Sequence, residues 1–505
     1  MELSRAVKKA PTESDQTTIV WLRDDLRLDD HPALAAAGGA PTLIVYIHDE
    51  DSEGLRRLGG ASRWWLARSL AALSRDVAAA GGRLDVLRGP AEPILTRLAK
   101  SSGAQRAFWT RRYGAAEIAI DSSVKAALRR AGVDAQSFNG QLLREPWEVR
   151  TDGGTPFRVF SAFWRRSLAL GPLPAPAAGP ARLTAARWPD EAGIRTTIAD
   201  LGLTPTRPDW SGGLAETWTP GETGARARLA AFVEGALRGY DQARDRPAGE
   251  TTSRLSPHLR FGEVSPRRVA AAIQLALAEG GAPPGASQKF LAELGWREFS
   301  YSLLHAFPDL ARRSWQSDFD SFPFVDDAAG RAAWERGQTG YPIVDAGMRE
   351  LWRTGFMHNR VRMVAASFLV KHLLVDWRCG ERWFWDTLCD ADPANNPASW
   401  QWVAGSGADA APYFRIFNPI LQGQKFDPDG AYVRRWVPEL AGLGPESIHA
   451  PWTASADALR RAGVTLGATY PAPIVDHDFA RRRALAALAR TKGGGDAGAA
   501  RGETR

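Results

Sequence analysis

Carboxylates, amides and indole rings lie together in one short stretch toward the C-terminal end of the chain. The stretch contains two aspartates, two asparagines and two tryptophans, at Asp390, Asp392, Asn395, Asn396, Trp400 and Trp402. A metal pair is disfavoured, because no histidine or further aspartate accompanies the first two carboxylates at ligand spacing. An isolated Asp-x-Asp pair normally caps a helix. The chain holds 20 tryptophans, and although most are expected to be core or interface anchors, the excess also suits redox chemistry or base stacking.

A second candidate site is a run of hydroxyl side chains before a predicted helix, Thr251-Thr-Ser-Arg-Leu-Ser-Pro-His258. The local signal is helix capping, with Ser256 as the N-cap and Pro257 at the first helical position. Hydroxyls and backbone N–H groups at a helix start also form an anion site, which suits the pyrophosphate of a cofactor. The two interpretations are compatible, and the local pattern alone favours capping.

A third candidate lies on a predicted amphipathic helix at Gln288–Ser300. Glu293 and Trp296 are three residues apart and project from one face of this helix, whereas Phe290 and Leu294 point elsewhere, into the core. Spacing alone indicates a surface glutamate beside a packed tryptophan.

Two other patterns carry little chemistry. The segment Gly405-Ser-Gly-Ala-Asp-Ala410 formally fits a dinucleotide fingerprint, but it follows no apolar strand, so NAD binding is not expected. The cysteines, Cys379 and Cys389, are too few for a disulfide framework or for a four-cysteine cluster made by this chain alone. We expect both to be ordinary buried thiols.

Alternating strands and helices predict an N-terminal α/β domain over residues 17–148. Apolar runs indicate buried strands, and the segments between them have helical spacing. This alternation is typical of a parallel, doubly wound, Rossmann-like sheet. The predicted strands are Thr18–Arg23, Leu43–Tyr46, Leu84–Leu87 and Ala107–Thr110, and the clearest helices are Ser62–Ala80 and Ala115–Ala131.

A mostly α-helical domain is predicted over residues 223–490. Its helical spacing is clearest at Ala225–Leu237, Gln288–Leu304 and Phe356–Trp377. Residues 149–222, rich in Pro, Gly and Ala, predict a connection over the surface with short helices inside it. Residues 1–16 predict a disordered leader and residues 491–505 a disordered tail.

Composition limits the class of protein. A chain of 505 residues is expected to form two domains, and 44% hydrophobic with 24% charged residues is typical of a soluble globular protein. No apolar run has the length of a membrane span, and acidic residues near the N-terminus argue against an import presequence, so we expect a cytoplasmic location. The net charge of +7 is compatible with a polyanionic partner but is weak evidence alone.

Three blocks in a fixed order carry a resemblance to a known family. They are Gly340-Tyr-Pro-Ile-Val-Asp-Ala-Gly-Met348, Met357-His-Asn-Arg-Val-Arg-Met363 and the stretch from Asp390 to Pro419. Together they resemble the flavin-binding core of the photolyase/cryptochrome family, in its bacterial cyclobutane-dimer branch. The resemblance implies bound FAD and light-dependent repair of pyrimidine dimers in damaged double-stranded DNA, by electron transfer to a flipped-out lesion. A cryptochrome-type blue-light photoreceptor is the alternative.

The resemblance also implies which residues contact the flavin. Asp390 is expected to pair with Arg362 beside the isoalloxazine ring, and Asn396 to face flavin N5, where an amide can donate or accept a hydrogen bond. The hydroxyl run becomes the flavin phosphate loop. The full cofactor set is Tyr240, Thr252, Ser253, Arg254, Leu255, Ser256, Arg362, Asp390, Asp392 and Asn396.

The resemblance places the lesion beside the third candidate site. Trp296 is expected to stack on the extruded pyrimidines, while Glu293 hydrogen-bonds a base carbonyl. Asn359 stands where a (6-4) photolyase would carry a histidine, which favours cyclobutane dimers. The implied lesion residues are Glu293, Trp296, Asn359, Met363 and Trp402, and the implied DNA-backbone contacts are Arg244, Arg360 and Gln422.

Trp400 and Trp377 match the two inner members of the family's electron-transfer chain. The third, solvent-edge position is Phe324 here, and phenylalanine is far harder to oxidise. Trp315, Trp334 and Trp352 stay open as substitutes. The resemblance further implies an antenna chromophore, methenyltetrahydrofolate or alternatively a deazaflavin, and a monomer with no obligate protein partner and no metal.

Overall fold

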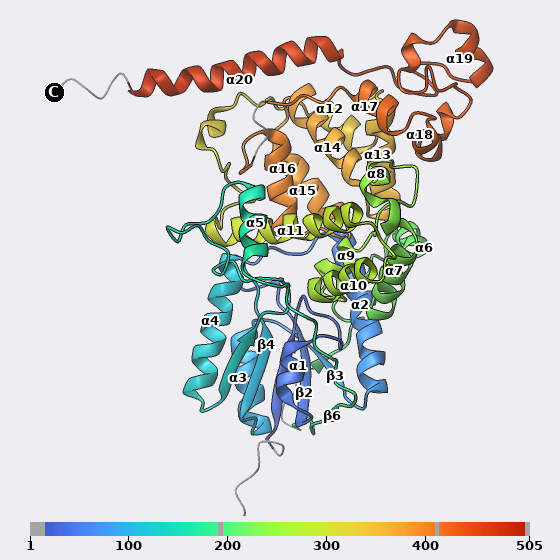
Figure 1. Ribbon diagram of the computed structural model, residues 1–505. Helices are drawn as coiled ribbons and strands as arrows, with labels where there is room; N and C mark the ends of the chain where they lie inside the picture. Colours follow the sequence, from blue (N-terminus) through green and yellow to red (C-terminus); the bar gives the residue numbers. More distant parts are fainter. Residues whose placement is uncertain (1–15, 190–194, 410–413, 500–505) are drawn as a thin grey trace, which may run out of the picture.

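The computed structural model describes residues 16–189, 195–409 and 414–499. A sheet with flanking helices forms one end of the molecule, and a larger helical body packs against it (Figure 1). The α/β and helical domains predicted from the sequence are confirmed. Among the described residues, no helix has both the length and the apolar composition needed to cross a bilayer.

The sheet has the strand order β5-β4-β1-β2-β3-β7, and β6 pairs with β2. The five central strands run parallel, with β1 between β4 and β2, so that Ile19 lies opposite both Ala107 and Leu43. These strands are β1 (Thr18–Leu22), β2 (Pro41–His48), β3 (Leu84–Arg88), β4 (Arg106–Thr110) and β5 (Asp134–Phe138), and the helices between them are α1 (Pro32–Ala37), α2 (Gly60–Ala79), α3 (Ala91–Ser102) and α4 (Ala115–Arg130).

The first four strands match the apolar runs in the sequence. Strand β5 had not been predicted, because its Asp-Ala-Gln-Ser-Phe sequence is an edge strand without an apolar run. The connecting segment contributes α5 (Phe160–Ala169) and α6 (Gly212–Thr217), and it also adds two short strands to the sheet, β6 (Thr184–Ala185) and β7 (Arg195–Thr196).

The helical body buries a large aromatic and aliphatic core. Trp334, Trp377 and Phe368 in this core are fully shielded from solvent. Its helices are α7 (Glu222–Glu234), α8 (Tyr240–Ala243), α9 (Ser256–Arg260), α10 (Pro266–Ala278), α11 (Pro284–Ala306), α12 (Ala328–Glu335), α13 (Pro342–Thr354), α14 (Asn359–Ser367), α15 (Trp377–Thr387), α16 (Asn395–Ala404), α17 (Pro419–Phe426), α18 (Ala431–Trp436), α19 (Ala456–Ala462) and α20 (His477–Ala499), with shorter 3₁₀ turns η3 (Ala236–Gly239), η4 (Ser317–Ser321), η6 (Pro438–Leu440) and η7 (Pro451–Thr453).

The helix predicted over Phe356–Trp377 is interrupted. Helix α14 continues into a π-helical segment, η5 (Phe368–His372), and the chain then turns at Leu374, whose φ of 57° is left-handed. Asp376 caps the next helix by accepting from the Arg378 N–H at 2.8 Å. The helical spacing over this range had predicted one helix, but the cap at Asp376 starts a second one.

The C-terminal end of the chain is helical further than expected. The predicted tail begins at residue 491, whereas the backbone of α20 stays helical to Ala499, because no proline interrupts the run. Residues 500–505, and all of the predicted leader except Gln16, lie outside the described residues.

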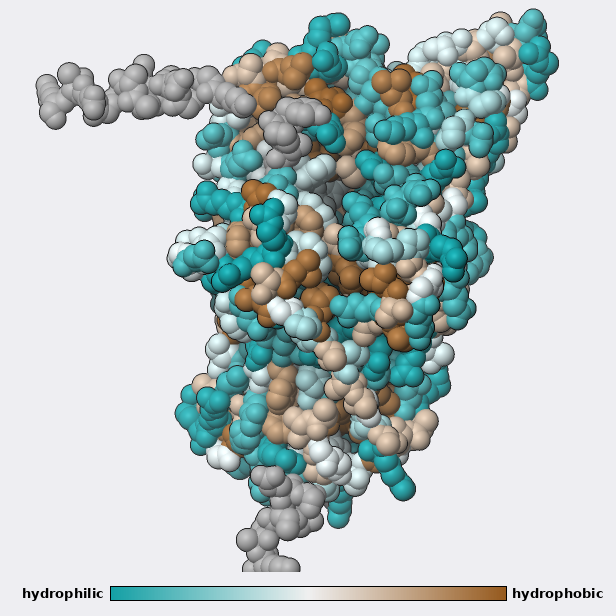
Figure 2. All heavy atoms as spheres, in the orientation of Figure 1, coloured by the Kyte–Doolittle hydropathy of each residue, from teal (hydrophilic) through white to brown (hydrophobic). Residues whose placement is uncertain are grey.

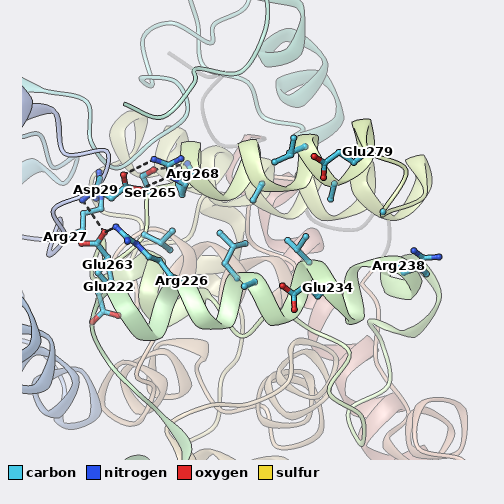
Figure 3. A pocket seen from close by; sticks show the side chains of 18 residues that line it. Arg27, Asp29, Glu222, Arg226, Glu234, Arg238, Glu263, Ser265, Arg268 and Glu279 are labelled. Carbon is cyan, nitrogen blue, oxygen red and sulfur yellow. Dashed lines mark hydrogen bonds and ion pairs between the residues drawn. The ribbon is translucent and has the colours of Figure 1, made fainter. Parts of the chain in front are cut away.

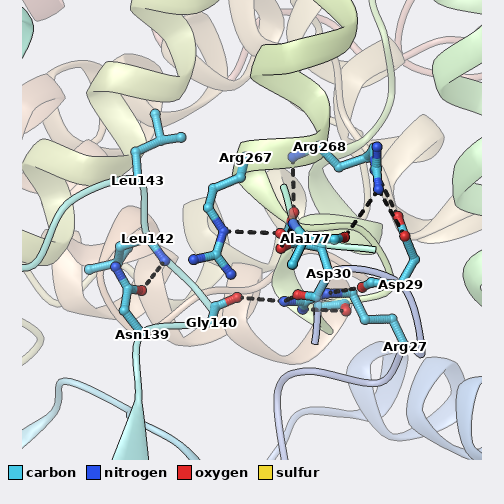
Figure 4. Close-up of polar contacts among 12 residues, drawn as sticks. Arg27, Asp29, Asp30, Asn139, Gly140, Leu142, Leu143, Ala177, Arg267 and Arg268 are labelled. Carbon is cyan, nitrogen blue, oxygen red and sulfur yellow. Dashed lines mark hydrogen bonds and ion pairs between the residues drawn. The ribbon is translucent and has the colours of Figure 1, made fainter. Parts of the chain in front are cut away.

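Arginine side chains hold the two domains together through hydrogen bonds and an ion pair (Figure 4). The Arg27 guanidinium donates to the carbonyls of Gly140 at 2.9 Å and Gly262 at 3.0 Å, so that one N-terminal side chain also binds the helical domain. Arg268, on α10, makes two hydrogen bonds with the Asp29 carboxylate, at 2.7 and 2.8 Å. The domains therefore meet at a fixed interface and not through a flexible hinge.

Candidate functional site

The first cluster forms around Asp390, between α15 and α16. Its Oδ2 accepts from the Ser256 hydroxyl at 2.6 Å and from the Arg362 guanidinium at 2.8 Å. The predicted Asp390–Arg362 pair is therefore confirmed. Asp390 is 8% exposed, and its second oxygen, Oδ1, is buried with no hydrogen-bond partner in the described part of the chain.

The capping role predicted for Ser256 is wrong. Leu255 is the N-cap of α9, and Ser256 is already the first helical residue. Its hydroxyl points to Asp390, because a charge-assisted bond to a buried carboxylate is stronger than a bond to a free backbone N–H. The helix start is thereby tied to the carboxylate cluster.

Asp392 is not the N-cap of α16, which is Ala394, but its side chain binds the backbone at this helix start. Its Oδ1 accepts from the backbone N–H groups of Ala394 at 2.8 Å and Asn395 at 2.7 Å, at the start of α16. Its Oδ2 accepts from the Tyr301 hydroxyl at 2.7 Å. Burial raises the pKa of Tyr301 well above its ordinary value, so this phenol stays a donor. Asp392 thus anchors α16 to α11.

Asn396 is oriented by a carboxylate on the neighbouring helix. Its Nδ2 donates to the Glu381 Oε1 at 2.9 Å and to the Glu381 carbonyl at 3.0 Å. The N–H groups of the amide are therefore committed to α15, and the carbonyl Oδ1 is the end left for another partner. A carboxylate accepts only, which is why the amide turns its nitrogen toward it.

The remaining residues of the hydroxyl run line a tight loop. Arg254 has a φ of 51°, a left-handed conformation that is uncommon for a residue with a side chain. Its guanidinium lies over the rings of Phe356 at 4.8 Å and Trp218 at 5.0 Å, and its Nε is buried without a partner in the described residues. Thr252 and Ser253 precede this turn, and Leu255 follows it with 1% of its surface exposed.

Tyr240 lies apart from the carboxylates, at the start of α8. It packs between Phe232 and Phe290 at centroid distances of 5.5 and 5.3 Å. The Arg244 guanidinium covers its ring at 5.3 Å.

The second cluster lies on α11, where the predicted face is confirmed. Phe290 and Leu294 are buried, whereas Glu293 forms an ion pair with Arg244. Trp296 stacks on Phe160, with centroids 3.9 Å apart and planes within 11°. One face of this indole is therefore already covered, and a base can stack only on the other.

The pairing of Arg244 was not foreseen. As a DNA-backbone contact it was expected to face solvent, but its side chain is 13% exposed and bound to Glu293. The arginine instead sets the position of the carboxylate.

The start of α14 connects the two clusters. Arg362 binds Asp390, and two residues earlier Arg360 binds Asp245, the neighbour of Arg244 in the chain, at 2.7 Å. Asn359 is exposed at the first position of this helix, and Met363 packs partly buried against the core. Trp402, on α16, also packs partly buried against this core.

His358 serves this helix structurally. Its Nδ1 accepts from the Arg360 N–H at 3.2 Å and caps α14. Burial lowers its pKa to about 4, so the ring is neutral at neutral pH.

An open hollow of about 580 Å³ adjoins Arg360. Gln422 lines it, and the Gln422 Oε1 is buried without a partner among the described residues. The hollow also contains basic and amide side chains from Arg415, Asn418 and Lys425. These groups offer charge and hydrogen bonds beside the second cluster.

A larger cavity lies elsewhere, between α7 and α10 (Figure 3). It has a volume of about 640 Å³, an apolar floor and paired charges at its ends, and it contains none of the predicted site residues. Figure 2 shows apolar residues gathered across the middle of this face, at the level of α10 and α11; Leu275 of α10, 58% exposed, is one of the exposed apolar residues.

The two tryptophans expected to transfer electrons, on α15 and α16, are buried. Trp400 and Trp377 are 2% and 0% exposed, and both indole nitrogens lack a partner in the described part of the chain. Trp334 lies edge-on to Trp400 with centroids 6.1 Å apart, and its own nitrogen donates to Ala365. Phe324 packs on Phe322 instead.

The other two substitutes lie in different surroundings. Trp315 packs against Phe307, whereas Trp352 is 63% exposed and stacks on Trp383 at 6.0 Å. Of the three candidates, Trp334 is the one in direct contact with Trp400.

A parallel-sheet domain joined to a helical body with two linked polar clusters defines a class of two-domain flavoproteins. A model of the FAD binding domain of DNA photolyase matches residues 290–490, and a DNA photolyase model matches residues 18–181. A deoxyribodipyrimidine photo-lyase of Agrobacterium fabrum is 53% identical over 477 residues, 94% of this chain and 98% of that protein. Cryptochrome-2 of Arabidopsis thaliana is 40% identical over 487 residues, 95% of this chain and 79% of that protein.

Solved structures agree. A bacterial class III photolyase from Agrobacterium tumefaciens superposes with a TM-score of 0.91 at 51% identity, covering 97% of this chain and 100% of that one. The protein belongs to the DNA photolyase/cryptochrome family, and its C-terminal domain is a FAD-binding domain.

The residues present fit FAD. The buried, unpartnered Asp390 Oδ1 and Arg254 Nε are an acceptor and a cation that the described protein atoms leave unsatisfied. An unpaired polar atom in a native interior is costly, so both groups point to a missing polar ligand. The Asn396 carbonyl oxygen is a further acceptor, since Glu381 takes up only the amide nitrogen.

Sequence reasoning missed Glu381 and Arg56. Arg56 precedes α2 and makes two hydrogen bonds to the Glu381 carboxylate, which in turn holds Asn396. No local pattern marks either residue, since their partners lie far away along the chain.

Proposed function

We propose that this protein is a light-dependent DNA repair enzyme that splits cyclobutane pyrimidine dimers. The observation that carries the proposal is the start of α14, which contacts the Asp390 cluster through Arg362 and the Glu293 cluster through Arg360 and Asp245. A cofactor against the first cluster and a lesion against the second would be neighbours. Electron transfer between them needs that proximity.

Each cluster has a separate task. Asp390, Arg362, Asn396, Tyr240 and the loop at 252–256 hold and orient FAD. Trp296 stacks an extruded pyrimidine on its uncovered face, and Glu293, fixed by Arg244, hydrogen-bonds a base carbonyl. Asn359, Met363 and Trp402 complete the pocket walls and exclude water.

The cofactor carries the redox chemistry. When bound in its reduced form, FAD would supply light-driven transfer of one electron to the cyclobutane ring and would take that electron back after the ring opens, so that no net oxidation would occur. The protein supplies orientation, a shielded pocket and fixed charge. A damaged step is poorly stacked and therefore cheap to extrude, which gives selectivity without reading sequence.

Damaged duplex DNA is the proposed partner. Arg360 and Gln422 border the hollow that also contains Arg415, Asn418 and Lys425, and these groups suit phosphates next to the lesion. The proposal includes a cytoplasmic protein that is monomeric and needs no protein partner. Gel filtration of the purified protein tests the monomeric state.

An antenna chromophore, methenyltetrahydrofolate or a deazaflavin, is also proposed. A hollow at the carboxyl edge of the parallel strands is the customary ligand position in such sheets. It has a volume of about 90 Å³ here, whereas pockets for drug-sized ligands take roughly 300 Å³ or more. We therefore assign no antenna residues, and an absorption spectrum of the purified protein identifies the chromophore.

The test of function is illumination of dimer-containing duplex DNA with chemically reduced protein. Recovery of intact thymine in light, and none in the dark, is expected. No recovery on duplex or single strands would favour the cryptochrome-type photoreceptor. Recovery on single strands alone would restrict the substrate.

A further inference from the structure

One arginine of the N-terminal domain reaches into the flavin-binding half. Arg56 lies in the loop between β2 and α2, and its two terminal nitrogens bind Oε1 and Oε2 of Glu381 at 2.7 and 2.8 Å. The Glu381 side chain is 2% exposed and that of Arg56 is 33% exposed. This is a bidentate pair in which the buried member depends on the other for its counter-charge.

The loop is fixed against α15. A Cβ added at Gly59 would lie 2.2 Å from the Trp385 carbonyl, so only glycine allows this approach. The Trp385 indole donates to the Arg57 carbonyl at 2.8 Å, and the Arg56 guanidinium lies 3.9 Å from the Trp385 ring centroid. The Gly60 N–H binds Asp386 at 2.8 Å. Arg56 is therefore held in place from several sides.

The pair continues to Asn396. Glu381 Oε1, which Arg56 binds, also accepts from Asn396 Nδ2 at 2.9 Å. Because Arg56 binds both oxygens of Glu381, it fixes the orientation of this carboxylate and therefore the place of Oε1. Without Arg56 the carboxylate can rotate, and Oε1 is no longer held where it accepts from the amide nitrogen of Asn396.

We infer that Arg56 is a positioning residue for the cofactor. By holding Glu381 in a fixed orientation, it keeps the amide nitrogen of Asn396 on Glu381 and leaves the Asn396 carbonyl oxygen for the cofactor. This inference rests on the proposed function, in which Asn396 faces flavin N5. Reduced flavin carries an N–H at N5 and oxidised flavin does not, so a fixed acceptor favours the reduced cofactor that repair requires.

A purely structural role for Arg56 predicts something different. Other ion pairs, such as Arg268 with Asp29, already join the domains. If Arg56 only adds to that interface, its loss lowers thermal stability without changing the redox equilibrium of bound FAD. The redox equilibrium is therefore the measurement that separates the two roles.

The experiment is a spectroelectrochemical titration of FAD bound to the full chain. Arg56→Ala is expected to lower the ratio of reduced to oxidised FAD at a fixed potential about fivefold, the value of one ordinary hydrogen bond. Arg56→Lys keeps the charge but not the two-pronged contact, and it should recover only part of the ratio. The matched control is Arg57→Ala, because Arg57 is 70% exposed and its one ion pair, to Asp51, is 3.8 Å long.

A double-mutant cycle tests whether Arg56 acts on the cofactor through Asn396. In an Asn396→Ala background, Arg56→Ala should have no further effect on the ratio. Should that background lose FAD, Glu381→Gln replaces it in the cycle, with the same expectation. A ratio unchanged in Arg56→Ala, or an equal fall in both backgrounds, overturns the inference. Both results come from the redox measurement and do not depend on repair activity. Failure of the wild-type protein to repair dimers would therefore contradict only the proposed function.

Discussion

At the residue scale, the two aspartates of the Asp-x-Asp pair differ in their hydrogen-bond partners. Asp392 uses both oxygens on its own helix start and on Tyr301, so it is a structural anchor. Asp390 uses one oxygen on Ser256 and Arg362 and keeps the other free of protein partners in the described residues. Of the two, Asp390 is the one equipped to bind a ligand.

Glu293→Ala is expected to slow repair about tenfold while FAD stays bound, because one charged hydrogen bond to the lesion is lost and Arg244 keeps only its longer ion pair, to Asp245. The measurement is the repair yield per absorbed photon on dimer-containing duplex. Glu293→Gln, which keeps an acceptor, should lose less.

Glu279→Ala is the control, since that glutamate is exposed at the end of α10. Equal yields for Glu293→Ala and wild type would remove Glu293 from the lesion pocket.

Trp400→Phe is expected to abolish photoreduction of oxidised FAD while repair by chemically reduced protein continues. Trp334→Phe should slow photoreduction several-fold, because Trp334 is in contact with Trp400 whereas the usual outer position is Phe324. Transient absorption of the flavin after a flash measures both. Trp315→Phe is the control. Undiminished photoreduction in Trp334→Phe would exclude electron transfer through Trp334.

Local patterns predicted some of these contacts and missed others. The face of α11 follows from helical periodicity, and the Asp390–Arg362 pair came from the family resemblance. Ser256 was misassigned because capping propensity takes no account of a carboxylate 134 positions away. The hydrogen bonds that connect Arg56, Glu381 and Asn396 join three elements, and no residue spacing in the sequence predicts them.

At the element scale, helix α20 docks on the π-helical segment η5 through two histidines. His372 Nε2 and His477 Nδ1 are 2.9 Å apart, and Arg483 of α20 donates to the His372 carbonyl. Burial, and then the charge of His477, lower the pKa of His372 to about 3, and burial lowers that of His477. The contact therefore needs at least one neutral ring.

Acid is expected to loosen this contact. The folded pKa of His372 lies below its unfolded value, so its contribution to stability is complete above about pH 6.5 and is lost as the pH falls toward 3, by up to about 1.4 kcal/mol per pH unit. The hydrogen-exchange protection of α20 amides, which is the intrinsic exchange rate at each pH divided by the observed rate, should fall between pH 7 and 5. Lys371, whose pKa burial lowers to about 7, titrates above most of this range.

His372→Gln should flatten this pH dependence, because Gln can bond His477 without titrating. His305→Gln, on a partly buried histidine at the end of α11, is the control. Exchange rates that depend on pH equally in wild type and His372→Gln would contradict the account.

Element prediction succeeded where the hydrophobic pattern was strong. Apolar runs revealed β1 to β4, and α11 is continuous as its periodicity indicated. Strand β5 is polar, and β6 and β7 are two residues each, so no pattern separates them from loop. The break after His372 depends on the left-handed turn at Leu374, which no residue type there predicts.

At the scale of the whole molecule, binding of damaged duplex is expected to weaken steeply with salt, because lysine and arginine contacts to phosphate release counterions. Lys425→Ala, in the hollow beside Arg360, should weaken binding and reduce the slope of log Kd against log salt by about 1. Lys100→Ala, exposed on α3, is the control. An unchanged slope for Lys425→Ala would place the DNA on another face.

Domain organisation was predictable, but the relation between the domains was not. Two domains of these classes follow from chain length and periodicity. The interface depends on side chains such as Arg27, whose partners Gly140 and Gly262 lie in different domains. Such pairs have no signature in one sequence, and the site assembles only once they are in place.

The most direct test of the account is the structure of the reduced, FAD-loaded protein bound to duplex DNA with one cyclobutane dimer. We predict that both pyrimidines lie outside the helix stack, against the uncovered face of Trp296 and within hydrogen-bond reach of Glu293, with FAD against Asp390 and Asn396. A dimer that stays stacked in the duplex, or that binds at the cavity between α7 and α10, would contradict it.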